Sequence, residues 1–135
     1  MAKVQLGSNA TFLGGNKALS IYGNHISGLS GSVGVDNNET DLLNSTTGKY
    51  YSKVTILFEY AEDEPRSDDF IYRVRFNGIV VWLLLVPHSE AHYSQPTNLN
   101  IIIPPLTEIR CTAINDDNTN SRANLVVLAG RIYDA

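Results

Sequence analysis

Two histidines, His88 and His92, have the residue type and the spacing of a metal site. On a helix, histidines at i and i+4 can bind one zinc ion, and Glu90 between them could supply a third ligand. The segment around them shows no helical pattern, and it ends in Gln95-Pro96. We therefore expect solvated loop histidines here, with neither a bound metal nor another cofactor.

Carboxylates gather in three stretches, which are residues 36–41, residues 62–69 and Asp116-Asp117. Such loops can collect calcium, but none has the ligand order around a central glycine that an EF-hand requires. Calcium at one of them stays open as an alternative. Paired carboxylates can also cleave glycosidic bonds when their surroundings push their pKa values apart. Adjacent acids in one exposed loop lack such surroundings, so we predict that the chain is not an enzyme.

Cys111 is the single cysteine, so a disulfide within the chain is excluded. It lies in an alternating strand pattern, which favours a small buried side chain over a reactive thiol. Only Arg110 is a basic neighbour that would lower the pKa of the thiol. The chain also lacks the Gly-x-Ser-x-Gly, phosphate-binding and dinucleotide-binding motifs.

The bulk properties bound the possible partners. The 135-residue chain carries a net charge of -4 and 18% charged residues, which fits one globular domain. It has no cluster of Lys and Arg, so we expect neither a nucleic acid nor a membrane as partner. The longest apolar run, residues 79–87, is too short for a membrane helix. No secretory signal is visible at the N-terminus, so we expect synthesis and folding in the cytosol.

Period-two alternation predicts that the elements are strands. Along residues 50–60, apolar side chains alternate with polar ones, and we expect the apolar face to meet the core. Asn77-Gly78 is a strong signal for a type I′ turn between strands at 70–76 and 79–86. The second of these strands is almost entirely apolar. It is therefore buried on both faces, or covered on one face by a partner.

The remaining segments complete an all-β prediction. Four glycines in residues 18–35 disfavour a helix and predict a bent strand or a pair of short strands. We interpret residues 106–115 and 125–133, on either side of a polar tract, as a terminal β-hairpin. With short strands near 42–43 and 99–103, the count is about eight, the usual number for a jelly roll. We predict an eight-stranded, jelly-roll-like antiparallel β-sandwich over residues 18–135, preceded by an extended N-terminal arm of residues 1–17.

Four segments give the chain a resemblance to a known family. They are GKYYSKVTILFEY at 48–60, FIYRVRFNGIVV at 70–81, IIIPPLT at 101–107 and LAGRIY at 128–133. From about residue 39 to the C-terminus, the chain resembles the small jelly-roll virion proteins of tailed bacteriophages, in the manner of capsid cement or decoration proteins. The resemblance implies a homotrimer that is made in the host cytoplasm, binds the major capsid protein on the capsid surface and stabilises the head.

Aromatic side chains suggest where a partner would bind. The chain has seven Tyr and one Trp, and both residue types suit interfaces and sugar platforms. The polar tract 115–121 has no apolar residue and is expected to be an exposed tip. As candidate partner contacts we take Tyr51, Trp82, Asn115, Asp116, Asp117 and Asn118. The same aromatic content leaves an alternative open, which is a carbohydrate-binding module or the receptor-binding tip of a phage, with a glycan as ligand.

Overall fold

The computed structural model describes residues 19–60, 69–86, 97–115 and 122–133, and these residues form strands and turns without any helix. In chain order the strands are β1 (Leu19–Tyr22), β2 (His25–Leu29), β3 (Val33–Val35), β4 (Thr40–Thr46), β5 (Tyr51–Tyr60), β6 (Phe70–Phe76), β7 (Ile79–Val86), β8 (Thr97–Ile103), β9 (Glu108–Asn115) and β10 (Arg122–Tyr133). The described residues contain no helix that is long and apolar enough to cross a membrane.

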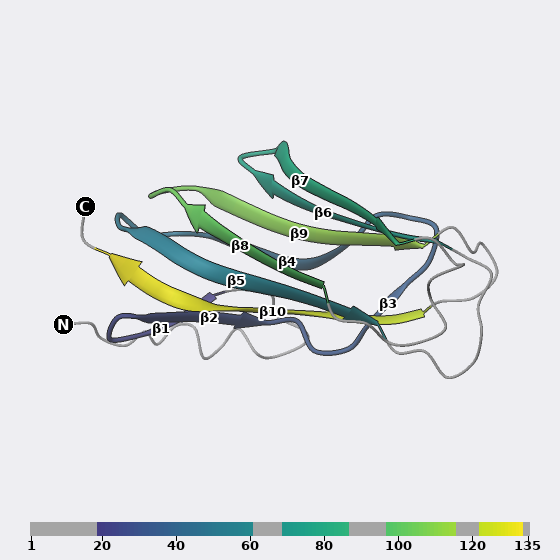
Figure 1. Cartoon of the computed structure of the whole chain (residues 1–135), viewed down its shortest axis with the longest axis horizontal. Coiled ribbons are helices and arrows are strands. Elements are labelled where there is room, and N and C mark those ends of the chain that lie inside the picture. Colours follow the sequence, from purple (N-terminus) through teal and green to yellow (C-terminus); the bar gives the residue numbers. More distant parts are fainter. Residues whose placement is uncertain (1–18, 61–68, 87–96, 116–121, 134–135) are drawn as a thin grey trace.

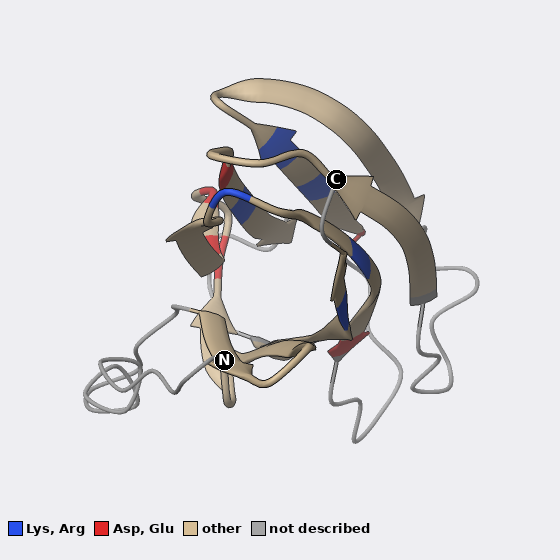
Figure 2. Cartoon of the chain, turned by 90° about the vertical axis from the view of Figure 1, so that its left-hand side faces the viewer, with Lys and Arg blue, Asp and Glu red and all other residues tan. Residues whose placement is uncertain are grey.

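The strands form two antiparallel sheets that lie face to face as the layers of a sandwich (Figure 1). Sheet A has the strand order β1-β2-β10-β5-β8, and β3 also pairs with β10. Sheet B has the order β4-β9-β6-β7. The predicted all-β antiparallel sandwich is therefore confirmed. Seen along the strands, both sheets curve around a common interior (Figure 2).

The described residues contain ten strands where the sequence analysis expected eight. The difference arises in the glycine-rich segment, which forms three short strands, β1 to β3, instead of one or two. Gly23 has φ 58° in the turn between β1 and β2, and Gly31 has φ 70° between β2 and β3. Glycine adopts this left-handed conformation at little cost, so each of the two positions allows a sharp reversal that ends a strand.

The predicted terminal β-hairpin is wrong. β9 pairs with β4 and β6 in sheet B, whereas β10 pairs with β2, β3 and β5 in sheet A. Each strand still alternates as expected, with Ile109 and Cys111 buried in β9 and Val126 and Leu128 buried in β10. Alternation reports that one face is buried, but it does not tell whether two neighbouring strands pair or face each other across a core.

The hairpin of β6 and β7 is confirmed. Its turn residues Asn77 and Gly78 have φ 51° and 83°, as a type I′ turn requires. Asn77 also fastens the turn to the start of β9. Its backbone N–H donates to the carbonyl oxygen of Glu108 at 2.8 Å, and its side-chain Oδ1 accepts from the Glu108 N–H at 2.9 Å.

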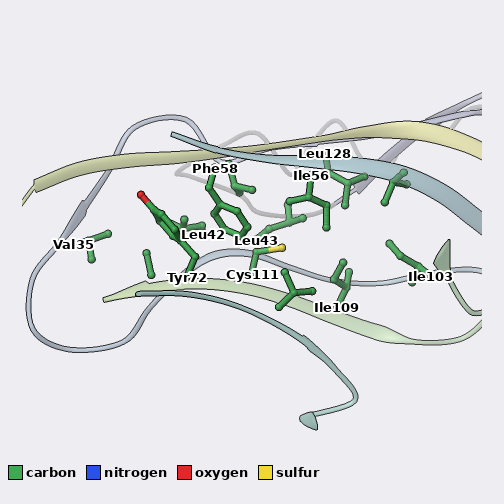
Figure 3. Packing of buried hydrophobic residues seen from close by; sticks show 14 of the residues in the cluster. Val35, Leu42, Leu43, Ile56, Phe58, Tyr72, Ile103, Ile109, Cys111 and Leu128 are labelled. Atoms are coloured by element: carbon green, nitrogen blue, oxygen red, sulfur yellow. The ribbon is translucent and has the colours of Figure 1, made fainter. Parts of the chain in front are cut away.

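Side chains from both sheets fill the interior (Figure 3). Phe58 of β5 stacks on Tyr72 of β6 with ring centroids 4.7 Å apart, so aromatic contact joins the layers. Gly130 of β10 pairs with Val54 and lies against the β5 backbone. A Cβ atom there would stand 2.1 Å from the carbonyl oxygen of Lys53 and 2.6 Å from the Cα of Val54. Only glycine fits this position without a shift of the β5 backbone.

Candidate functional site

Of the six predicted contact residues, the three that the structure describes do not form one surface. Tyr51 lies on the outer face of sheet A and is 42% exposed. Trp82 of sheet B is half-buried and stacks on Phe58, with ring centroids 5.7 Å apart. Asn115 is fully buried, and its Nδ2 donates to the carbonyl oxygen of Val35. Its side chain therefore holds β9 to β3 and does not face solvent. Residues 116–118 lie outside the described residues.

The structure describes only some of the candidate ligands for metal ions. His88, Glu90, His92 and residues 62–68 lie outside the described residues. In the acidic stretch 36–41, Oδ1 of Asp36 accepts a hydrogen bond from the Asn38 N–H at 2.9 Å and closes a turn. Over the described ranges, no three His, Cys, Asp or Glu residues lie close enough together to hold a metal ion.

The other two acids of that stretch form ion pairs on the outer face of sheet B. Glu39 accepts hydrogen bonds from Arg75 and, at 2.6 Å, from the Thr112 hydroxyl, and Arg73 lies 3.8 Å away. The hydrogen bond from Arg75 lowers the pKa of Glu39 below its usual 4.5, although partial burial opposes this shift. Asp41 pairs with Arg110 at 2.6 Å. Each of these three arginines thus lies beside a carboxylate.

The thiol of Cys111 is fully buried in the core. Burial raises its pKa to about 12 because the thiolate would lose its hydration. A thiol in this environment stays protonated and is a poor nucleophile at neutral pH. The expected buried cysteine is thus confirmed.

Strand β7 presents an apolar surface at the edge of sheet B. Its sequence IVVWLLLV contains no charged residue, and in the described sheet it pairs only with β6. The exposed side chains are Ile79 at 68%, Val80 at 42%, Val81 at 44%, Leu83 at 52% and Leu85 at 50%. Burial on both faces is therefore excluded for the single chain. The second expectation, that a partner covers one face of β7, stays a prediction.

A second surface lies on the outer face of sheet A. Its residues form a register row, that is, a line of directly paired residues that crosses the sheet from strand to strand. Tyr22 pairs with His25, His25 with Arg131, Arg131 with Lys53 and Lys53 with Ile102. The side chains in this row point away from the core, because their strand neighbours pack in it (Ile26, Val54 and Ile103) or against it (Ile21 and Ile132). Two residues along the strands, Tyr133 pairs with Tyr51. Their exposed fractions are 47% and 42%.

An open hollow of about 550 Å³ adjoins this row over β8, β5 and β10. Its lining includes Lys53, Thr55, Asn100, Ile102 and Ala129. The Thr55 hydroxyl donates to Oδ1 of Asn100 at 2.6 Å. This bond uses neither the amide N–H groups of Asn100 nor the lone pairs of the Thr55 hydroxyl oxygen, so a ligand in the hollow can bind to both.

No protein-family model and no curated protein matches the chain. Its surfaces must therefore be interpreted from their own chemistry. Sequence reasoning selected Tyr51 but missed Lys53, Arg131 and the hollow. The signal that was lacking is the register between β5 and β10, because Lys53 and Arg131 are far apart in the chain and adjacent only once that register is known.

Proposed function

We propose that this chain is a structural protein of a viral particle, a capsid cement or decoration protein that binds the major capsid protein and stabilises the head. In this role it acts on the capsid surface of a tailed bacteriophage and catalyses no reaction. One observation carries the proposal, namely the exposed aliphatic side chains of β7 at the edge of sheet B. Proteins that stay monomeric usually protect such an edge with charged residues, proline or a covering segment. An assembly protein covers it with a neighbour.

The neighbour on β7 is another copy of the chain, and we propose a homotrimer. Val81, Leu83 and Leu85 form the apolar centre of the contact. The ion pairs of Glu39 and Arg75 lie beside it on the same sheet and form a polar rim. An apolar centre inside a polar rim is the usual anatomy of a subunit interface. When three β7 strands meet around one axis, the exposed apolar side chains of all three subunits are removed from water.

We also propose that the sandwich has jelly-roll winding. The support is the order of its strands: apart from β1 and β2, the strands of sheet A follow β3-β10-β5-β8, and sheet B follows β4-β9-β6-β7. From β3 onward the chain changes sheets at each connection except the β6–β7 hairpin. This is the pattern of two four-stranded sheets wound from one long double-stranded ribbon. It agrees with the resemblance of residues 39 onward to small virion proteins.

The oligomer is tested by light scattering coupled to size-exclusion chromatography. We expect a trimer for the wild type and a monomer for the double variant Leu83→Lys/Leu85→Lys, because two charges at the centre of an apolar contact are desolvated without partners. The matched control is Leu29→Lys. Leu29 is 51% exposed on β2 of sheet A, so the change adds a charge of the same kind away from β7. A wild type that stays monomeric at high concentration contradicts the proposed assembly.

Binding to the shell needs a separate measurement. Heads assembled from the major capsid protein of the same virus, but lacking this chain, are mixed with the purified protein and sedimented. We expect saturable co-sedimentation and a higher melting temperature of the decorated heads. If the protein is trimeric but does not bind the heads, the proposed trimer stands and the cement role is refuted.

A further inference from the structure

We infer that the outer face of sheet A binds an acidic glycan, a sugar that carries a carboxylate or a sulfate group. The site consists of the register row from Tyr22 to Ile102, the Tyr51–Tyr133 pair and the adjoining hollow. It is separate from the proposed assembly surface because β7 belongs to the other sheet. The inference therefore does not depend on the proposed function.

The first argument is a pair of like charges. Lys53 and Arg131 lie directly opposite each other on the antiparallel strands β5 and β10. Like charges in this arrangement destabilise a sheet. In the part of the chain that the structure describes, the ion pairs are those of Arg73, Arg75 and Arg110, and none involves Lys53 or Arg131. Along β5 the next acid on the same face is Glu59, about 20 Å away at the usual rise of a strand.

The contrast with sheet B sharpens this argument. There, Glu39 and Asp41 form ion pairs with the three arginines of the outer face. The chain as a whole is acidic, with a net charge of -4, so carboxylates are not scarce. Two adjacent cations with no acid beside them among the described residues are therefore a specific local feature. An external anion between the two side chains would relieve their repulsion, and Arg131 offers the planar donor pair that suits a carboxylate or sulfate.

The second argument is that the surroundings of the cations suit a sugar. Tyr51 and Tyr133 are each about half exposed, and Tyr22 is 66% exposed. A phenol ring presents an apolar face to the C–H groups of a sugar and a hydroxyl group to its polar edge. Asn100 and Thr55 in the hollow supply an amide donor and a hydroxyl acceptor. Aromatic faces and neutral hydrogen-bonding groups beside two charges favour a glycan over an acidic peptide.

Nucleic acid fits the site less well. Binding to a phosphate backbone gains affinity from many cations along a groove. This face offers Lys53 and Arg131 in one row, with the apolar Ile102 at its end. The geometry thus suits a short ligand with one or two anionic groups.

The test uses the full chain on a glycan array that pairs sialylated and sulfated glycans with their neutral parents. Hits are then titrated by calorimetry with 3′-sialyllactose or a sulfated disaccharide against lactose. We expect the acidic members to bind at least tenfold more tightly than the neutral ones. The double variant Lys53→Gln/Arg131→Gln should lose this difference. The inference is overturned if no acidic glycan on the array binds, or if the neutral parents bind as tightly as the acidic glycans.

Two controls keep the result interpretable. Arg73→Gln removes a cation from the outer face of sheet B and should leave glycan binding unchanged. Lys53→Gln/Arg131→Gln removes the like-charge repulsion, so its urea midpoint should be equal to or higher than that of the wild type, and lost binding cannot then be attributed to unfolding. Poly-glutamate and single-stranded DNA serve as further probes, and binding of either as tightly as the acidic glycan refutes the glycan assignment.

Discussion

The hydroxyl group of Tyr72 in β6 donates a hydrogen bond to Oδ1 of Asn124 in β10 at 2.6 Å. The two strands belong to different sheets, so this bond crosses the core of the sandwich. Both residues are 1% exposed. A buried polar contact between the layers specifies how the sheets face each other, because any slip of one sheet would separate donor from acceptor in an apolar interior.

Replacing Tyr72 with Phe tests the contribution of this bond. The ring and its stacking on Phe58 remain, and only the hydroxyl group is lost. We expect a loss of about 1–3 kcal/mol in the free energy of unfolding, the usual range when a buried hydrogen bond is broken. Urea denaturation measures it. The matched control is Tyr51→Phe, an exposed tyrosine, for which we expect a change within about 0.5 kcal/mol. Equal effects of the two substitutions would show that the bond across the core contributes nothing.

Gly130→Ala is expected to be among the most damaging single-methyl additions in the chain. The new Cβ atom would stand 2.1 Å from the Lys53 carbonyl oxygen, and a backbone group inside a sheet cannot move aside. We expect a loss of about 3 kcal/mol or more, the upper part of the range for overpacking. Gly48→Ala is the control, because nothing lies within 4 Å of its added Cβ. It should change the stability by no more than about 1 kcal/mol. Soluble expression and urea midpoints of both variants give the answer.

The sequence predicted the faces of the strands better than their partners. Val54, Ile56 and Phe58 are buried as the alternation requires, and Asn77-Gly78 forms its turn. These features are local, because they depend on side chains two positions apart or on the φ preferences of single residues. Which strand pairs with which is not local. The misassigned β9–β10 hairpin and the missed Lys53–Arg131 pair have the same cause, since both depend on strand order and register.

The buried thiol of Cys111 supplies a probe of global unfolding. Its pKa of about 12 and its complete burial both suppress reaction with a disulfide reagent at neutral pH. We expect the folded protein to be modified at least a hundredfold more slowly than the protein in concentrated urea. The rate at intermediate urea should follow the unfolding equilibrium measured by tryptophan fluorescence. Rapid modification without urea would show that the core opens locally around β9.

The ion pairs of Glu39 predict how stability depends on pH. The pKa of Glu39 is lower in the folded chain than its usual 4.5, chiefly because Arg75 donates to the ionised carboxylate. The folded state therefore favours the charged form. This contribution is complete above about pH 4.5 and is lost as the pH falls through the lowered pKa of the folded state. Urea midpoints of the wild type, measured between neutral and strongly acidic pH, should decline in that window.

Glu39→Gln removes the titrating group, so its urea midpoint should be lower than that of the wild type at neutral pH. The difference should shrink as the pH falls below the usual pKa of 4.5. Arg75→Gln removes the main donor to Glu39, so the urea midpoint of this variant should fall less than that of the wild type as the pH is lowered. Some decline should remain, because Thr112 still donates to Glu39 at 2.6 Å. A Glu39→Gln variant that differs from the wild type by the same amount at every pH would show that the side chain acts by packing, and that the hydrogen bond from Arg75 does not favour the ionised carboxylate.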